Sequence, residues 1–403
     1  MKYCLLFHAN LNYSRLEPEK FEFVIRESYE KLVDLFANRY PDARWTFEAS
    51  GFTIEQMAKI APDVLEKYKK AFKKNCEFMG SPYAHSILAN VPYEDGLYSL
   101  KFGMEAYQKH LGFKPKSGWN PECSWNKTIP KMYEEAGYET LLIDWDSYLI
   151  STRPEVRAVE YDDDKTRHDG RKKPWYDADP NDKTLHFPAQ LTPKLKGVMR
   201  SDRTQMPPLR YMIGEETFEN GIAAIDKWAG KGDGYVVVFA EDAEYCGTSG
   251  YYFLKYHGEK RFFEHAPETI EKLIKVMDNI KTKGEFITIS DAANNFPVHN
   301  MKIQYDENMA WHRTVAEAWK NTKWAHELDP ICDDVRKKIK SAEQKAKTDK
   351  DKAVIKEAWF NLIQGENSDG RWPPGEGPAQ SNIDFCTNAL KKAEELLKGA
   401  KLI

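Results

Sequence analysis

Short apolar runs alternate with amphipathic segments along the first three quarters of the chain. The runs occupy residues 3–7, 45–47, 76–79, 118–120, 140–143, 197–199, 235–239 and 285–289. Segments with the apolar spacing of surface helices, such as FEFVIRESYEKLVDLFANRY, lie between most of them. Strands that alternate with helices predict βαβ units and a parallel sheet. Seven or eight such units favour an α/β barrel over an open, doubly wound sheet.

Two stretches depart from this alternation. Residues 151–193 contain the polar run EYDDDKTRHDGRKKPWYDADPNDK, which predicts a solvated insertion above the barrel. After residue 297 the apolar residues recur at helical spacing in three long segments. We therefore expect a catalytic barrel over residues 1–300 and a helical C-terminal domain over residues 301–403.

Composition narrows the classes of function. The chain has 403 residues, a formal net charge of −4 and 30% charged residues, which excludes a disordered chain and gives no electrostatic reason to expect nucleic acid. No apolar stretch approaches the roughly 18 residues of a membrane helix. The six cysteines form no CxxC pair, and scattered cysteines are typical of a reducing compartment. We expect a cytoplasmic protein without a membrane segment.

Motifs of several other chemistries are missing from the sequence. It contains no HExxH or HxxxH, no GxSxG, no GxxxxGK[ST] and no GxGxxG. Their absence makes metal-dependent and esterase activities poorer alternatives. The aromatic content is high, with 11 Trp, 21 Tyr and 20 Phe, and aromatic rings can stack on the apolar C–H faces of sugars.

Ionisable side chains directly follow six of the predicted strands. In a parallel barrel the carboxyl ends of the strands form the active site. A single carboxylate at such a place usually caps the next helix, but six strand ends of this kind together predict a functional rim. The residues are His8, His85, Glu122, Asp144, Asp146, Arg200, Asp202, Arg203, Glu241, Asp242 and Glu244.

Two carboxylates at one rim meet the requirement for glycoside hydrolysis. One carboxyl group protonates the leaving oxygen, and the other attacks the anomeric carbon or activates water. Trp119 and Trp125 flank Glu122, which fits a sugar site. We count Trp119 and Arg200 among the predicted sugar contacts.

Side-chain alternation orders the three acids of the segment FAEDAEYCG. Successive side chains of a strand point to opposite faces. Asp242 and Glu244 are therefore expected on the face toward the barrel axis, and Glu241 on the other face. Alternation thus makes Asp242 or Glu244 likelier than Glu241 to face the axis, and Glu241 a bystander or helix cap.

Six segments resemble those of a known enzyme family, and they occur in the same order. They are FHANLNYSRL, WTFEASGFTIEQM, GSPYAHSILANVP, GWNPECSWNKTIPKMYEEAGYETLLIDWD, VVVFAEDAEYCG and EAWFNLIQGENSDGRW. Together they resemble glycoside hydrolase family 57, the amylase and 4-α-glucanotransferase family, whose fold is an incomplete (β/α)7 barrel. The family's first region is written around H-Q-P; here His8 matches the histidine, but Ala9 and Asn10 replace Gln and Pro.

The resemblance implies roles for individual residues. Glu122 falls on the catalytic nucleophile of the W-x-x-E segment, and Asp242 on the general acid/base of the D-x-E-x-x-G segment. His8, His85, Asp144 and Glu244 fall at or beside the reacting subsite, and Asp369 and Trp372 would approach the cleft from the helical part. The implied mechanism is retaining, passes through a covalent glycosyl-enzyme and requires no metal and no cofactor.

The sequence leaves the substrate open. The resemblance implies an α-glucan hydrolase or a 4-α-glucanotransferase that acts on α-linked oligo- or polysaccharides. An α-galactosidase of the same family, a metal-dependent polysaccharide deacetylase and a non-catalytic sugar-binding protein are the alternatives. Neither the choice between hydrolysis and transfer nor the oligomeric state follows from the sequence.

Overall fold

Each of the seven apolar runs before residue 240 forms a strand, and consecutive strands are parallel. The strands are β1 (Lys2–Ala9), β2 (Trp45–Ala49), β3 (Cys76–Gly80), β4 (Ser117–Trp119), β5 (Thr140–Asp144), β7 (Lys196–Arg200) and β8 (Val236–Asp242). The computed structural model describes residues 1–152, 178–232, 234–254, 259–299, 309–310, 314–315, 319–373 and 377–403. Most of the predicted insertion, residues 153–177, lies outside the described residues.

The ring of strands stays open between β7 and β8. β8 pairs with β1, and β2, β3, β4, β5 and β7 follow in that order. The outer edge of β7 takes the short antiparallel strand β6 (Ala189–Gln190), and no ladder joins β7 to β8 among the described residues. At this gap the Thr204 hydroxyl donates a hydrogen bond of 2.7 Å to the Val238 carbonyl. The architecture is the expected incomplete (β/α)7 barrel.

The eighth apolar run forms a shorter strand than predicted. β13 (Glu285–Ile287) pairs only with the first residues of β1 and stops two residues before the predicted end. Thr288 ends it, because its hydroxyl caps the helix α13 (Ile289–Asn294) and the Asp291 carboxylate caps the Thr288 backbone in return. β13 therefore extends the amino-terminal end of the barrel and does not reach the opposite rim.

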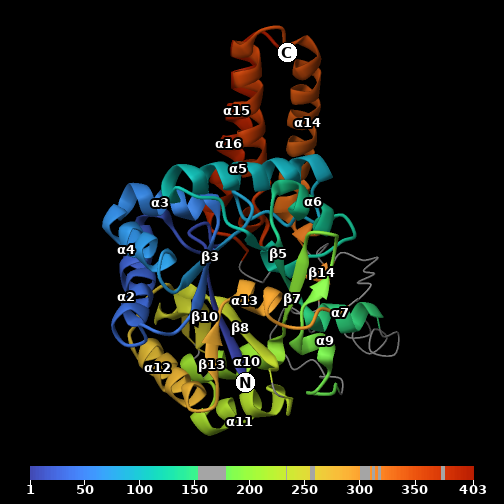
Figure 1. The fold of residues 1–403 in the computed structure, drawn as a ribbon. Helices are drawn as coiled ribbons and strands as arrows, with labels where there is room; N and C mark the ends of the chain where they lie inside the picture. Colours follow the sequence, from blue (N-terminus) through green and yellow to red (C-terminus); the bar gives the residue numbers. More distant parts are fainter. Residues whose placement is uncertain are drawn as a thin grey trace.

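Helices cover the outside of the barrel (Figure 1). They are α1 (Phe21–Val24), α2 (Lys31–Asn38), α3 (Gly51–Ile60), α4 (Pro62–Phe72), α5 (Tyr93–Leu111), α6 (Ile129–Ala136), α7 (Trp145–Thr152), α9 (Lys183–His186), α10 (Asp202–Met212), α11 (Phe218–Trp228) and α12 (Glu268–Lys281). Within the described part of the chain, no helix is long and apolar enough to cross a membrane.

Alternation along the strands separates two apolar layers. Cys4, Leu6 and Val238 pack together inside the barrel, whereas Tyr3 and Leu5 pack outward with the helices. The same alternation continues to the strand ends, so that the even-numbered residues of β1 and β8 face the barrel axis. The site residues of these two strands are therefore placed by the same pattern that builds the core.

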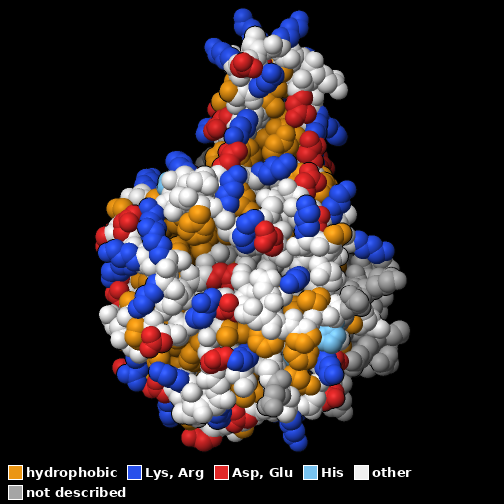
Figure 2. Space-filling view, in the orientation of Figure 1, with side chains coloured by type: hydrophobic (Ala, Val, Ile, Leu, Met, Phe, Trp, Pro, Cys, Tyr) orange, Lys and Arg blue, Asp and Glu red, His pale blue; other side chains and the backbone are white. Residues whose placement is uncertain are grey.

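Three helices project from the barrel and carry the C-terminus at their far end (Figure 1). They are α14 (Lys323–Lys345), α15 (Asp349–Gly365) and α16 (Gln380–Gly399). α15 packs on α5 through aromatic rings, with Tyr98 stacked on Trp359 at 4.6 Å. Hydrophobic side chains fill the space between the projecting helices, and charged side chains surround them (Figure 2). The helical part was expected, while the domain boundary at residue 300 stays a prediction.

The loop between α15 and α16 returns the chain to the barrel. It contains the 3-10 turn η8 (Ser368–Arg371), in which the Ser368 backbone N–H donates to the His85 carbonyl at 3.1 Å. The turn is buried at the base of the projecting helices. This return brings Asp369 and Trp372 to the carboxyl ends of the barrel strands.

Candidate active site

A cavity of about 50 Å³ lies at the carboxyl ends of the strands. Eight of the ten predicted site residues line it: Glu122, Asp242, His8, His85, Trp119, Arg200, Asp369 and Trp372. The other lining residues are Asn10, Tyr13, Cys123, Gln205, Ala240 and Glu241. Asp144 and Glu244 do not line the cavity, and their proposed sugar contacts stay predictions.

Glu122 enters the cavity from a strained turn. It lies in the 3-10 turn η3 (Pro121–Cys123), just after β4, and both Glu122 and Cys123 have left-handed backbone angles, with φ of 56° and 48°. Such angles cost a non-glycine residue about 1–3 kcal/mol and cluster at functional sites. The turn is braced because the Asn120 side chain donates hydrogen bonds to the carbonyl and the hydroxyl of Ser124. The backbone therefore fixes how the Glu122 carboxyl group approaches the cavity.

Asp242 stands at the end of β8, and the ladder register places it opposite His8 of β1. Its Oδ2 accepts a hydrogen bond of 2.5 Å from the Tyr13 hydroxyl. Burial raises the pKa of Asp242, while the positive charge of His8 and the Tyr13 hydrogen bond oppose that rise. A carboxyl group with a raised pKa can hold a proton near neutral pH, as a general acid must.

His8 lies between two carboxylates. On its other side the register pairs it with Glu48 of β2, whose fully buried carboxylate contacts His8 Nδ1. Burial alone would lower the pKa of His8, but Glu48, followed by Asp242 and Glu244, raises it to about 10. His8 is therefore a cation at neutral pH in a cavity that is otherwise rich in acids.

The same cation acts on Glu122. Burial raises the pKa of Glu122 well above its usual range, and the neighbouring Asp369 and Asp242 raise it further. The charge of His8 lowers it. The ionised form of Glu122 is thus favoured by His8 and opposed by the other carboxylates.

Residues of the helical part complete one wall. Asp369 Oδ2 lies 3.4 Å from His85 Nδ1, and the Ser368 hydroxyl lies 3.2 Å from the same nitrogen. Trp372 is the first residue after the turn η8, and its ring packs on that of Tyr13, with ring centres 6.4 Å apart. The turn η8 therefore contributes a carboxylate to the cavity, and the residue after the turn contributes an indole ring.

Asn10 joins this wall to the barrel. Its Nδ2 donates to Asp369 Oδ2 at 3.0 Å, and its backbone N–H donates to Glu244 Oε1 at 2.9 Å. A proline at this position has no backbone N–H and could not make the second bond. The replacement of the family's H-Q-P by His-Ala-Asn thus gives the site a link between two of its carboxylates.

The predicted orientation of Glu241 was wrong. Its side chain lines the cavity and accepts a hydrogen bond of 2.6 Å from Gln205, because a long side chain at the strand end can turn into the gap beside β7. Glu244 is fully buried behind the cavity, where Tyr29 and the Asn10 backbone donate to it. Burial is the main cause that raises the pKa of both Glu241 and Glu244 to about 8.

A buried arginine bridges the open side of the barrel. Arg200 donates to Asp144 and Asp202, each at 2.6 Å, and also to Gln205, which in turn donates to Glu241. This chain of hydrogen bonds connects β7 to β8 at the rim, where no strand ladder joins them. Asp144 also accepts a hydrogen bond from the Ser147 backbone at 2.8 Å, so the common capping role of a strand-end carboxylate holds here.

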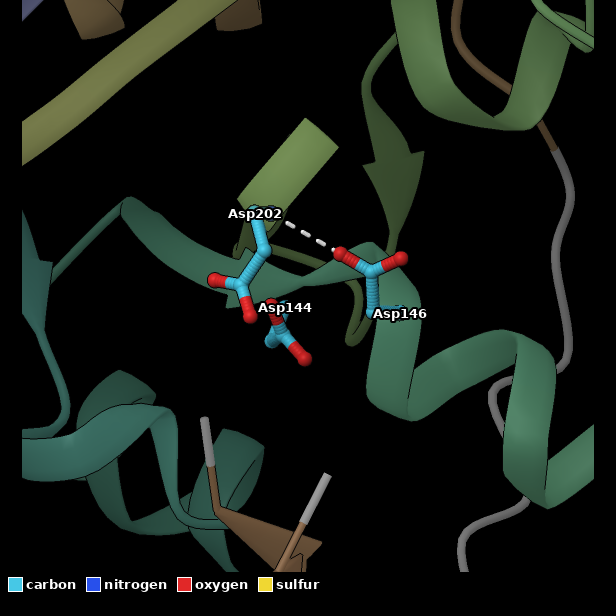
Figure 3. Close-up of side chains that lie close together, drawn as sticks. All are labelled: Asp144, Asp146 and Asp202. Atoms are coloured by element: carbon cyan, nitrogen blue, oxygen red, sulfur yellow. Dashed lines mark hydrogen bonds between the residues drawn. The ribbon is translucent and has the colours of Figure 1, made fainter. Parts of the chain in front are cut away.

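Asp144, Asp146 and Asp202 come together beside the cavity (Figure 3). One oxygen from each lies within 4.8 Å of the others, a spacing that a metal ion could use. Each carboxylate of the cluster is already paired with a guanidinium group: Arg200 contacts Asp144 and Asp202, and Arg203 contacts Asp146 at 3.2 Å. The arrangement is that of a buried ion-pair network that supports the cavity wall.

Four residues of the site were missed at the sequence level: Asn10, Tyr13, Glu48 and Gln205. Asn10, Tyr13 and Glu48 act through contacts that depend on the register of β1 against β2 and β8 or on the return of the helical part. One signal was available, because Glu48 is a charged residue inside a strand that is otherwise almost entirely apolar.

Comparison with known proteins connects this site to an enzyme family. The sequence model of glycosyl hydrolase family 57 matches residues 3–306. No curated protein sequence matches the chain.

Solved structures of similar fold cover nearly the whole chain. A 4-α-glucanotransferase from Thermococcus litoralis has a TM-score of 0.65 at 16% identity over 98% of this chain. A GH57 branching enzyme from Thermococcus kodakaraensis, solved with glucose, has a TM-score of 0.63 at 15% identity, also over 98%. The α-amylase AmyC from Thermotoga maritima has a TM-score of 0.61 at 13% identity over 99%. The chain spans 59% of the glucanotransferase, 88% of the branching enzyme and 93% of the amylase.

Proposed function

Because the chain belongs to glycosyl hydrolase family 57, we propose that it cleaves or transfers α-linked glucan units with retention of configuration. The observation that carries the proposal is the meeting of Glu122 and Asp242 in one buried cavity beside the cation His8. The two carboxyl groups come from separate strands of the barrel, one after β4 and one at the end of β8. Family membership makes the chain one of the glycoside hydrolases and transglycosylases.

In the proposed first step, Glu122 Oε attacks the anomeric carbon while Asp242 gives its proton to the leaving glycosidic oxygen. The C–O bond to the leaving group breaks, and an ester bond to Glu122 forms. In the second step, Asp242 takes a proton from water or from a sugar hydroxyl, whose oxygen displaces Glu122. Asp242 loses one proton in the first step and regains one in the second, so it ends each cycle protonated.

His8 favours the ionised form of both carboxyl groups, and the proposed mechanism needs that form at Glu122. Asp242 must begin protonated and Glu122 ionised, although burial raises the pKa of both. A positive charge at His8 favours ionisation of its neighbours. The proposed role of His8 is therefore electrostatic, and it comes in addition to any contact with a sugar hydroxyl.

The cavity walls favour a sugar ring. Trp119 and Trp372 supply aromatic faces, and Arg200, His85 and Asp369 supply polar groups for hydroxyls.

Product analysis tests the proposal. Purified protein is incubated with maltose, maltotriose, longer malto-oligosaccharides and α-galactosides, and the products are separated by chromatography. Longer malto-oligosaccharides would identify transfer, and shorter ones hydrolysis. Release of galactose alone would move the assignment to an α-galactosidase, and the absence of any product from all substrates would contradict the α-glycoside assignment.

A further inference from the structure

A second and larger cavity lies at the base of the projecting helices. Its volume is about 220 Å³, against about 50 Å³ for the candidate active site. It lies between the loop after β3, the helix α14 and the turn η8. Its lining residues are Ile87, Asn90, Val91, Pro92, Trp319, Lys320, Asp329, Cys332, Asp333, Arg336, Glu366, Ser368 and Arg371, and none of them lines the active-site cavity.

The turn η8 separates the two cavities. Its residues Ser368 and Arg371 face the larger cavity, whereas Asp369 and the following Trp372 face the active site. The three-residue repeat of a 3-10 turn explains this division. The larger cavity is therefore a separate space that shares one wall with the active site.

The larger cavity is lined by three basic and three acidic side chains, so the charges of its wall balance. Arg336 donates to Asp95, Asp333 and Glu366 at 2.5, 2.5 and 2.7 Å. Arg371 donates to Asp329 at 2.7 Å and to backbone carbonyls. Because each guanidinium is already paired with carboxylates, the wall does not select strongly for an anion. It offers donors and acceptors side by side, as a neutral polyhydroxy ligand needs.

An aromatic ring completes this chemistry. Trp319 lines the cavity, is 5% exposed and packs edge-on against Trp372 at 5.9 Å. The aliphatic parts of Ile87 and Val91 give the cavity an apolar side.

We propose that this cavity is a second carbohydrate site that takes one pyranose unit. The room for this unit is the cavity volume of about 220 Å³. The Arg–carboxylate pairs would bind hydroxyls, and the Trp319 ring would lie against C–H groups. The proposal does not depend on turnover at Glu122 and Asp242.

Titration with D-glucose tests the second site. Val91 is half-buried in the wall, and Val91→Trp should fill the cavity. Wild-type protein should bind two equivalents of D-glucose by calorimetry or ligand-observed NMR, and Val91→Trp only one. Two equivalents with unchanged affinity in a folded Val91→Trp variant would overturn the proposal.

Neighbouring aspartates of α14 provide a matched pair that does not depend on how Val91→Trp folds. Asp333 lines the cavity and pairs with Arg336, whereas the equally exposed Asp334 pairs with Lys338 outside it. Asp333→Ala should weaken one glucose site about fivefold, and Asp334→Ala should match wild type. Equal affinity in both variants would overturn the proposal. If glucose binding depends on Asp333 but no glycoside is turned over, the proposed enzymatic function fails and the second site stands.

Discussion

Tyr13 donates its hydroxyl hydrogen to Asp242 Oδ2 over 2.5 Å, at the point where the β1 loop meets the end of β8. This hydrogen bond lowers the pKa of Asp242, against the larger upward effect of burial. Tyr13 also packs on Trp372 and therefore touches the wall contributed by the helical part. The protonation of the proposed acid/base is thus connected to both parts of the chain.

Tyr13→Phe removes this donor and keeps the ring. The pKa of Asp242 should rise, so Asp242 stays protonated to higher pH and the alkaline limb of the kcat/KM profile moves upward. A hydrogen bond to a charged group contributes about 1.5–3 kcal/mol, so kcat/KM should also fall by about 10- to 100-fold. Tyr29→Phe is the control, because Tyr29 donates to Glu244. An alkaline limb that moves only in the control would assign the acid role to Glu244.

Asn10→Asp changes one atom of the link to Asp369. The amide donor becomes an acceptor, and two carboxylates then face each other at hydrogen-bond distance. At low pH one of them can hold a proton and restore the bond, whereas at high pH they repel. Activity relative to wild type should therefore fall by about tenfold or more as pH rises from about 5 to 8, a range that spans the loss of a shared proton. If the activity of the variant relative to wild type stays constant with pH, the hydrogen bond between Asn10 and Asp369 does not have this role.

Asp242→Ala should affect poor leaving groups most. Natural α-glucosides need protonation of the leaving oxygen, while an aryl glycoside with an activated phenol does not. The variant should lose several orders of magnitude more activity on the natural sugar. Azide should restore the aryl reaction and give a glycosyl azide of retained configuration, because it replaces the activated water.

Two neighbouring acids are the controls for this experiment. Glu241 now lies in the cavity wall and Glu244 behind it. Neither Glu241→Ala nor Glu244→Ala should show azide rescue. Rescue in either variant and none in Asp242→Ala would transfer the acid/base role to that residue.

Arg200→Met tests the bridge across the open side of the barrel. Asp144 and Asp202 would keep their burial but lose their guanidinium partner, and breaking a buried ion pair costs about 3–5 kcal/mol. Urea unfolding should show this loss. The exposed Arg39, which pairs with Asp278 at the surface, gives the control Arg39→Met, which should change stability far less.

The loss of stability in Arg200→Met should depend on pH. Burial raises the pKa of Asp144 to about 6 even with Arg200 present, above its value of 3.8 in an unfolded chain. A carboxyl group with a raised folded-state pKa binds its proton more tightly in the folded state, so it lowers stability as pH rises through that range. The charge of Arg200 lowers the pKa of Asp144, so this pKa should rise further when Arg200 is removed. The destabilisation should therefore be greater at pH 8 than at pH 5, and the reverse order would contradict the assigned charges.

The strands and much of the candidate site could be predicted because alternation and strand ends are local properties. The seven apolar runs predicted the strands of the barrel. The polar residues at the strand ends predicted a shared site, and five of them line one cavity: Glu122, Asp242, His8, His85 and Arg200. The end of β13 was missed because a capping box at Thr288 interrupts an apolar run. Local chemistry of this kind overrides hydrophobic continuity.

The remaining contacts depend on long-range register. His8 meets Asp242 and Glu48 only because β1 pairs with β8 and β2 in one particular alignment. Glu241 was placed on the wrong face because strict alternation stops applying where a long side chain leaves the last residues of a strand. Asn10 and Asp369, 359 positions apart, meet through the return of the helical part. No local pattern encodes such a pairing.

In the proposed mechanism Glu122 forms the covalent bond to the sugar. Asp242→Ala protein is incubated with an activated 2-deoxy-2-fluoro-α-glucosyl donor, which forms the ester quickly and releases it slowly. Intact-protein mass spectrometry should show one added fluoroglucosyl group, and peptide sequencing should place it on Glu122. The same treatment of Asp242→Ala/Glu122→Gln should add nothing. An adduct on Glu241 or Glu244 instead, or turnover of natural substrate by Glu122→Gln above a tenth of the wild-type rate, would contradict the account.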